Sequence, residues 1–390
     1  MEVAEGLLGL ALIAAVLWDV FQTVVVPRPS PGRFRIARNL TKVSWRMTRA
    51  VALRSGDSRR RDGILGVFAP ASVLLLLVAW VVTLLLGYGL LVYALRDELQ
   101  PPPTTLAEAI YAAGTALFTI GFGDFVPTGT AARMISLVAA GTGLGIVALV
   151  ITYLFSLYGA FQRREVLVVT LDSRAGAPPS GVALLETYAR LDLVHELPDL
   201  FASWEVWAAE VLDSHVAYPI LGFFRSSHDN ESWVSSIGAV LDAATLVLTT
   251  VEGVPRGHAQ MMAAMGEHLV EDVAQIVGFE NEPGAGIARM EFDEARQRLV
   301  TAGYSLSEAD LSWRLFGARR SHYAARLNLL AEFWVSPPSQ WIGDRAPVGH
   351  HNEDAVELQG FGQTLLVPAA AVDERPAAMD TPAVEPARKV

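Results

Sequence analysis

Residues 119–124 read Thr-Ile-Gly-Phe-Gly-Asp, and this segment is the strongest indication of fold in the chain. Its two glycines alternate with bulky apolar residues. Because glycine lacks a Cβ atom, such a segment can run extended with its carbonyl groups turned to one side. Four copies around an axis would form stacked rings of oxygens that replace the water shell of K⁺. The residues that would bind the ion are Thr119, which adds its hydroxyl, Ile120, Gly121, Phe122 and Gly123.

A short apolar helix is predicted immediately before this stretch. Three prolines at 101–103 block a helix upstream, and Thr105-Leu-Ala-Glu108 is a capping box. A helix over 106–117 would be about 18 Å long, too short for a hydrocarbon core of about 30 Å. Lying between two longer apolar runs, it is typical of a re-entrant helix, and its C-terminal end would direct about half a negative charge at an ion path. The alternative is an ordinary amphipathic loop helix.

Three longer apolar runs predict three membrane-spanning helices. They cover 6–26, 64–95 and 134–161, and Pro70 suits the first turn of the second. The first run is not a typical signal peptide, because acidic residues precede it and Trp18 and Asp19 interrupt it. The fold class is therefore an all-α membrane protein with three spanning helices and one re-entrant helix.

Basic residues predict the orientation. The connector 27–63 holds eleven basic residues and two acidic ones. Because basic loops stay inside, we expect the connector in the cytoplasm and the protein in the cell (inner) membrane. The N-terminus is then outside, and everything after Phe161 is cytoplasmic. Three acids, Asp97, Glu98 and Asp124, would lie near the outer mouth and raise the local cation concentration.

The connector also predicts an amphipathic helix with a basic face. Such helices lie at the surface of anionic membranes, so we expect this one to bind acidic lipids. The alternative is a basic segment that only keeps the connector inside. Its apolar stripe is Ile36, Leu40, Val43, Met47 and Val51, and the lipid-binding candidates are Arg35, Arg38, Lys42, Arg46 and Arg49.

Asp19 is a carboxylate inside the first apolar run. Such a group costs about 2.5–3.5 kcal/mol in the middle of a membrane, so we expect it to face protein or water. The connector or the lower half of the third run, at Thr152 or Tyr153, would supply its partner. The alternative is that it reaches the cytoplasmic interface.

The second half of the chain differs in charge and composition. Residues 1–164 carry a net charge of +6 and the whole chain −11, so the remainder carries −17, which argues against nucleic-acid binding. There are no cysteines, so no disulfide or thiolate metal site is expected. We divide the chain into a spanning helix at 1–26, the connector at 27–63, a pore module at 64–162, a helical cytoplasmic domain at 163–335 and a disordered tail at 336–390.

Turn and capping signals predict mostly helices in the cytoplasmic domain. Val166–Leu171 fits either a strand or a continuation of the preceding helix. The apolar run at 237–251 is short and contains Asp242, so it predicts a buried core helix. The other expected helices cover 181–191, 198–214, 216–224, 231–251, 255–277, 285–302 and, after a capping box at 305–308, 309–334. No nucleotide-binding, EF-hand or paired-histidine metal pattern is present in the sequence.

From about Val67 to Phe161 the chain resembles the pore module of prokaryotic potassium channels. The resemblance rests on the 119–124 stretch and its flanking helices, and it implies a homotetrameric, passive K⁺ channel with no enzymatic activity and no cofactor beyond the permeant ion. In that family a tryptophan often stands at the position of Tyr111, where it braces the filter. The implied supporting residues are Tyr111, Thr115 and Asp124, and the candidate gating hinges are Gly141, Gly143 and Gly145 in the inner helix, which could equally serve close helix packing.

Two other functions share parts of this pattern. A non-selective cation channel has the same fold but usually carries a polar or acidic residue between the two filter glycines, where this chain has Phe122. Gly121-Phe-Gly-Asp124 also matches the signature of intramembrane aspartyl proteases, with Asp19 as a second carboxylate. Three spans are too few for that protease fold, and the predicted topology places the two acids on opposite sides.

Overall fold

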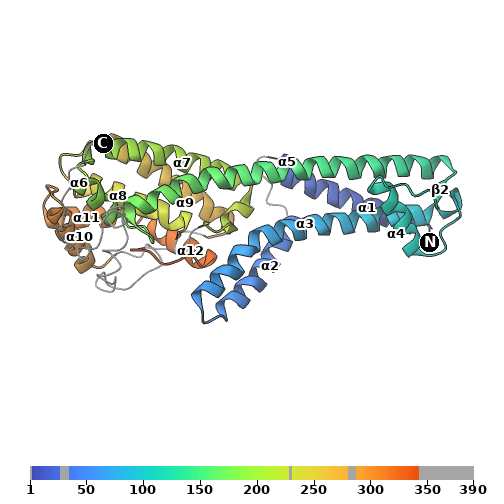
Figure 1. The fold of residues 1–390 in the computed structure, drawn as a ribbon, viewed down its shortest axis with the longest axis horizontal. Helices are drawn as coiled ribbons and strands as arrows, with labels where there is room; N and C mark the ends of the chain where they lie inside the picture. The colour runs from blue at the N-terminus through green and yellow to red at the C-terminus, as the bar shows by residue number, and fades with distance from the viewer. Residues whose placement is uncertain (1, 27–34, 228–230, 280–286, 342–390) are drawn as a thin grey trace, which may run out of the picture.

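The computed structural model describes residues 2–26, 35–227, 231–279 and 287–341, and almost all of its regular structure is helical. The chain is an elongated all-α membrane protein (Figure 1). One long helix, α5, runs through most of its length. Helices α1, α3 and α4 lie beside α5 toward one end, and helices α6 to α12 gather around its other end as a helical domain.

The three predicted membrane-spanning helices are confirmed as helices that are long and apolar enough to cross a membrane. The predicted short helix is also present with the expected bounds, 106–117. The helices of this half are α1 (Glu2–Val20), which ends in a π-helical turn (Phe21–Val25), α2 (Ile36–Leu53), α3 (Ser58–Ala94), α4 (Leu106–Leu117) and α5 (Thr130–Ala175).

Glycines allow α1 to pack closely against α3. A Cβ atom at Gly9 would lie 2.6 Å from the carbonyl oxygen of Gly87, and one at Gly87 would lie 2.8 Å from the Ile13 side chain. Small residues at such crossings let helix backbones approach in a membrane, where the hydrophobic effect does not drive helices together. The close contact fixes α1 on the pore module.

The second spanning helix begins earlier than predicted. It starts at Ser58, where the Asp57 side chain accepts a hydrogen bond from the Arg59 amide at 3.1 Å, so Pro70 lies inside α3 and not in its first turn. In the turns before Pro70, the buried residues Phe68 and Ala69 belong to the same core as the helical domain.

The third spanning helix continues past its predicted end at Phe161. Helix α5 runs without interruption to Ala175, so Val166–Leu171 continues the helix and is not a strand. The domain boundary expected at 162–163 therefore falls inside a continuous helix. The pore module and the helical domain share one helix (Figure 1).

The helical domain is built around α8 (Trp233–Thr249), nearly all of whose side chains are buried. The predicted buried core helix is thus confirmed. Asp242 is buried there because Arg320 donates to it at 2.9 Å and the Tyr323 hydroxyl at 2.7 Å. The surrounding helices are α6 (Gly181–Arg190), α7 (Leu197–Ala217), α9 (Gly257–Val277), α10 (Arg289–Thr301), α11 (Ala309–Arg320) and α12 (Ala324–Trp334), with short 3₁₀ turns at Val194–Glu196 and Pro219–Phe223.

Three predictions for this domain are wrong in part. The helix expected over 216–224 is absent: α7 ends at Ala217, and only the 3₁₀ turn at 219–223 follows. The helix expected over 309–334 is two helices with a break at 321–323, and its N-cap is Glu308, whose carboxylate accepts from the amides of Asp310 and Leu311. The disordered tail expected from residue 336 onward is wrong for its first six residues. Residues 336–341 pack on the domain with Trp341 buried, while 342–390 lie outside the described residues.

Candidate functional site

Thr105 caps the start of helix α4 as predicted, but Glu108 accepts its closest hydrogen bonds from Thr104 and not from the Thr105 amide that a capping box uses. The Thr105 hydroxyl accepts from the Glu108 amide at 3.2 Å, and the Glu108 carboxylate accepts from the amide and the hydroxyl of Thr104 at 2.7 and 3.0 Å. Three successive prolines precede the cap. These features fix where α4 begins and leave its C-terminal carbonyls directed at residues 119–124.

The backbone of this stretch alternates in handedness. Thr119, Gly121 and Gly123 have φ angles of 56°, 61° and 82°, whereas Ile120 and Phe122 are not among the described residues with positive φ. Alternating φ gives successive peptide groups similar orientations, so their carbonyls turn to one side. A positive φ is costly for a β-branched residue such as Thr119, and such strain is kept where the surrounding structure enforces it.

Hydrogen bonds to α4 enforce this conformation. The Thr115 carbonyl accepts from the amides of Ile120 at 2.8 Å and Gly121 at 3.2 Å, and the Ala116 carbonyl accepts from the Thr119 amide at 2.9 Å. Thr115 was expected to support the stretch, and it contributes through its carbonyl. Its hydroxyl instead donates to the Ala112 carbonyl at 2.8 Å.

The side of residues 119–124 away from α4 is uncovered in the single chain. Ile120 is 53% exposed and Phe122 is 68% exposed. Cβ atoms built at Gly121 and Gly123 meet nothing within 4 Å, so only the positive φ, and no steric contact, requires glycine at these positions. The single chain therefore leaves a strained segment with two large apolar side chains exposed.

Tyr111 and Asp124 brace the end of the stretch. The Tyr111 ring packs edge-on against Phe125 with centroids 6.2 Å apart. The Asp124 carboxylate lies near the Tyr111 side chain and accepts from the Phe125 amide at 3.2 Å.

Of the other acids near this end, Glu98 is engaged in structure and Asp97 is exposed. The Glu98 carboxylate accepts from the Ala132 amide at 3.0 Å and thereby caps α5, while its carbonyl accepts from the Thr128 amide at 2.8 Å. These bonds accompany a two-residue antiparallel pairing of β1 (Leu99–Gln100) with β2 (Val126–Pro127). Asp97 and Asp124 therefore remain as the exposed carboxylates.

The three candidate hinge glycines differ in their surroundings. Helix α5 is continuous through all of them. A Cβ atom at Gly143 would overlap the carbonyl oxygen of Leu117, whereas nothing lies within 4 Å of one at Gly141 or Gly145. The packing interpretation therefore accounts for Gly143, where α5 meets the end of α4.

The basic residues of the connector do not form one surface. Arg35, Arg38 and Lys42 line a cavity of about 450 Å³ between α2, α3 and the helical domain. Arg46 is exposed, and Arg49 donates to the Glu332 carbonyl of α12 at 3.3 Å. On the predicted apolar stripe, Val43, Met47 and Val51 are all more than half exposed, as an interfacial helix requires.

Asp19 faces protein, as predicted. It is 1% exposed and accepts from the Ala37 amide at 3.1 Å and the Trp80 indole at 2.8 Å. The connector thus supplies one partner and α3 the other. Neither partner suggested in the inner helix is used, since the Thr152 hydroxyl donates to the Ala148 carbonyl at 3.0 Å and no bond from Asp19 to Tyr153 occurs among the described residues.

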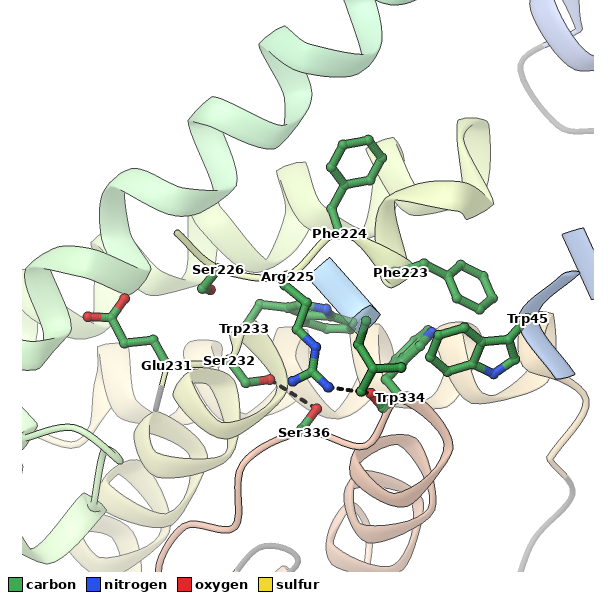
Figure 2. Close-up of a pocket in the computed structure, with 12 residues that line it drawn as sticks. Trp45, Phe223, Phe224, Arg225, Ser226, Glu231, Ser232, Trp233, Trp334 and Ser336 are labelled. Atoms are coloured by element: carbon green, nitrogen blue, oxygen red, sulfur yellow. Dashed lines mark hydrogen bonds between the residues drawn. The ribbon is translucent and has the colours of Figure 1, made fainter. Parts of the chain in front are cut away.

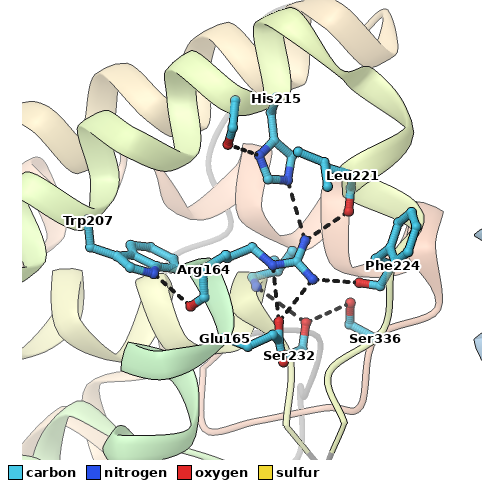
Figure 3. Close-up of polar contacts among 10 residues, drawn as sticks. Arg164, Glu165, Trp207, His215, Leu221, Phe224, Ser232 and Ser336 are labelled. Carbon is cyan, nitrogen blue, oxygen red and sulfur yellow. Dashed lines mark hydrogen bonds and ion pairs between the residues drawn. The ribbon is translucent and has the colours of Figure 1, made fainter. Parts of the chain in front are cut away.

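Sequence patterns did not reveal the cluster at Arg164. This side chain is buried and donates to the carbonyls of Leu221 and Phe224, both at 2.8 Å, and to the Glu165 carboxylate at 3.0 Å (Figure 3). Burial and the positive charge of Arg164 lower the pKa of His215 to about 3. The neutral His215 donates from Nδ1 to the Val211 carbonyl and presents Nε2 to Arg164 at 3.5 Å. In the sequence, this position is recognisable only as the second of two adjacent arginines at 163–164.

Aromatic side chains join the connector to the helical domain beside this cluster. The Trp45 ring lies 4.9 Å from that of Phe68 and 5.0 Å from that of Phe223. Figure 2 shows Trp45, Phe223 and Trp334 around a small cavity of about 20 Å³, beside which Arg225 donates to the Trp334 carbonyl at 3.3 Å. Arg225 also donates to the Val335 carbonyl at 2.7 Å. Movements of α2 and of the helical domain are therefore coupled by direct packing.

Comparison with known proteins agrees with this geometry. Residues 73–159 match a family model described as "Ion channel". A protein of Bacillus subtilis (strain 168), described as "Uncharacterized membrane protein YdjJ", is 25% identical over 243 residues, which are 61% of this chain and 68% of that protein. No solved structure matches the chain. The family match covers α4, residues 119–124 and the part of α5 beside them, and it supports an ion channel in a membrane, a non-enzymatic role.

Proposed function

We propose that this chain forms a homotetrameric channel that conducts K⁺ passively across the cell membrane. Residues 119–123 are its selectivity filter, and α4 is its pore helix. The carrying observation is the alternation of positive φ at Thr119, Gly121 and Gly123, which turns the carbonyls of one short segment to the same side. Carbonyl oxygens in such rings replace the hydration shell of K⁺.

The exposure of the filter supports assembly. One chain supplies one carbonyl at each level, and a complete ring needs four. The uncovered apolar side chains of Ile120 and Phe122, together with the exposed outer face of α5, are surface that identical copies would cover around a fourfold axis. No cofactor is needed, because the permeant ion is the ligand.

The charge distribution supports one orientation. The connector is basic, so the proposal places α2 and the helical domain on the cytoplasmic side, with the N-terminus and the filter toward the outside. Asp97 and Asp124 are then exposed near the outer mouth and attract cations to it. The enzymatic alternative is disfavoured by the same arrangement, because Asp124 lies beside the filter while Asp19 is bonded at the connector.

A non-selective cation channel is the second candidate, since it shares this fold. The two are separated by reversal potentials of purified protein in planar bilayers with K⁺ exchanged for Na⁺. A K⁺ channel shifts its reversal potential toward the K⁺ equilibrium potential. Reversal potentials that do not respond to the exchange would support the non-selective channel.

A matched pair of glycines tests the role of the filter. Gly123 and Gly253 have φ angles of 82° and 81°, and a Cβ atom at either meets nothing within 4 Å. Replacing either by alanine therefore imposes the same local strain, about 1–2 kcal/mol. Gly123→Ala should abolish K⁺ selectivity or current with the tetramer intact, whereas Gly253→Ala, in the helical domain, should preserve both. Equal effects on selectivity would remove the filter from the proposal.

A further inference from the structure

A cavity of about 450 Å³ lies where the membrane helices meet the helical domain. Its walls come from the end of α1, the first turns of α2, α3 near Leu76, the 3₁₀ turn at 219–223 and the last turns of α9. Protein interiors are close-packed and leave few voids larger than a water molecule. This volume falls within the roughly 300–1,000 Å³ of pockets that bind small molecules.

One wall of the cavity is cationic. Arg35, Arg38 and Lys42 line it, and burial together with the charges of Arg38 and Arg46 lowers the pKa of Lys42. The negative charge of Asp19, in the neighbouring helix α1, attracts the guanidinium of Arg35. The lining acid on the facing wall, Asp272, lies 3.3 Å from its own partner His268. The balance of charge on the lining is positive, so an anion is favoured there.

The rest of the lining is mostly apolar and includes a buried hydroxyl without a partner in the described part of the chain. Val73, Leu76 and Ile276 contribute hydrocarbon surface. The Ser72 hydroxyl is buried, lines the cavity and has no hydrogen-bond partner among the described residues. A buried hydroxyl without a partner costs about 1–3 kcal/mol. A ligand that accepts a hydrogen bond from this hydroxyl would remove that cost.

We infer that this cavity binds the anionic headgroup of an acidic phospholipid from the adjacent leaflet. The phosphate lies against Arg38 and Lys42 within reach of Ser72, the glycerol region contacts the apolar lining, and the acyl chains remain in the bilayer. The inference rests on the proposed function only in placing this junction at the cytoplasmic membrane surface. Because the cavity lies between the first turns of α2 and the last turns of α9, occupancy sets how these two helices pack.

The test measures lipid binding to the full chain in detergent, where no charged bilayer surface contributes. Dioleoylphosphatidylglycerol is titrated into purified protein, with native mass spectrometry counting bound lipids and Tm as a second readout. Arg38→Gln/Lys42→Gln should weaken binding about thirtyfold. The matched control Arg46→Gln/Arg54→Gln removes two charges from the same connector but outside the cavity, and should change binding less than about twofold. Conduction is not involved, so a failure here leaves the proposed function standing.

Further arms keep the inference open to refutation if the double variant fails to fold. Ile276→Trp fills the cavity from the wall opposite Arg38 without a change of charge, and should also weaken binding while the Tm without lipid is retained. Inorganic phosphate alone should leave the Tm unchanged. Equal losses in the cavity and control variants, full binding by Ile276→Trp, or a Tm rise with phosphate as large as that with lipid would each overturn the inference.

Discussion

The indole of Trp80 donates a hydrogen bond of 2.8 Å to the carboxylate of Asp19, and both side chains are buried. The same carboxylate oxygen accepts from the Ala37 amide in the first turn of α2. One acid therefore joins three helices that are distant in sequence. A negative charge near the start of α2 also interacts favourably with the helix dipole.

Removing the Asp19 carboxylate should loosen this junction. Asp19→Leu leaves the Trp80 indole and the Ala37 amide as buried donors without a partner, which costs about 1–3 kcal/mol for each donor. Trp80→Phe removes one donor and should cost less. Thermal unfolding in detergent measures both, with Trp18→Phe as the control because Trp18 is 58% exposed. If Asp19→Leu unfolds at the wild-type temperature, the carboxylate does not stabilise the junction.

Two glycines of α5 should respond to alanine with opposite signs. A methyl group at Gly143 would collide with the Leu117 carbonyl and displace the end of α4, an overpacking cost of about 1–3 kcal/mol. Gly141→Ala meets no atom within 4 Å and removes a poor helix former, a gain of about 1 kcal/mol. The Tm of the two variants measures this difference. A Gly143→Ala protein as stable as wild type would leave only the hinge interpretation for this residue.

Periodicity and capping patterns were sufficient to predict the elements near residues 119–124. The bounds of α4 followed from three prolines and a capping box, because these signals act within a few residues of the helix they start. The burial of Asp19 followed from the cost of a carboxylate in a membrane. Both are consequences of local chemistry or of the solvent, so no knowledge of distant contacts was needed.

Tertiary contacts account for what the sequence did not reveal. Pro70 suggested a helix start, but Asp57 caps α3 earlier and Phe68 packs against Phe223 of the helical domain. Arg164 follows the third apolar run at 134–161, yet carbonyls from residues 221 and 224 satisfy its guanidinium. These partners are more than 50 residues away in the chain, and no local pattern identifies them.

Acid should destabilise the helical domain through His215. Its pKa is about 3 in the folded protein and about 6.5 when exposed, so the unfolded state takes up a proton first as the pH falls. Stability from this group is complete above pH 6.5 and is lost as the pH falls toward 3, by about 2 kcal/mol at pH 5. Thermal unfolding between pH 7 and pH 5 should show this slope, and His215→Gln should reduce it. The same slope in the variant would assign the effect to other groups.

Neighbouring arginines in α5 should differ sharply in their effect on stability. Arg164 is buried and holds the turn at 221–224, whereas Arg163 is exposed. Arg164→Met removes the donors of two buried carbonyls and leaves the Glu165 carboxylate as an uncompensated buried charge, a loss of about 3–5 kcal/mol. Arg163→Met should change stability by less than about 0.5 kcal/mol. Thermal unfolding and proteolysis of the 219–227 segment measure these effects.

A double variant separates the charge from the hydrogen bonds of Arg164. Arg164→Met/Glu165→Gln removes both members of the buried ion pair, so the cost of the unpaired carboxylate disappears while the Leu221 and Phe224 carbonyls still lack their donor. We therefore expect the double variant to regain part of the stability lost in Arg164→Met and to stay below wild type. Full recovery would mean that the two carbonyls gain nothing from Arg164. No recovery would mean that the Glu165 charge does not destabilise the Arg164→Met protein. The role of Arg164 would then be only to hold the turn at 221–224 against α5.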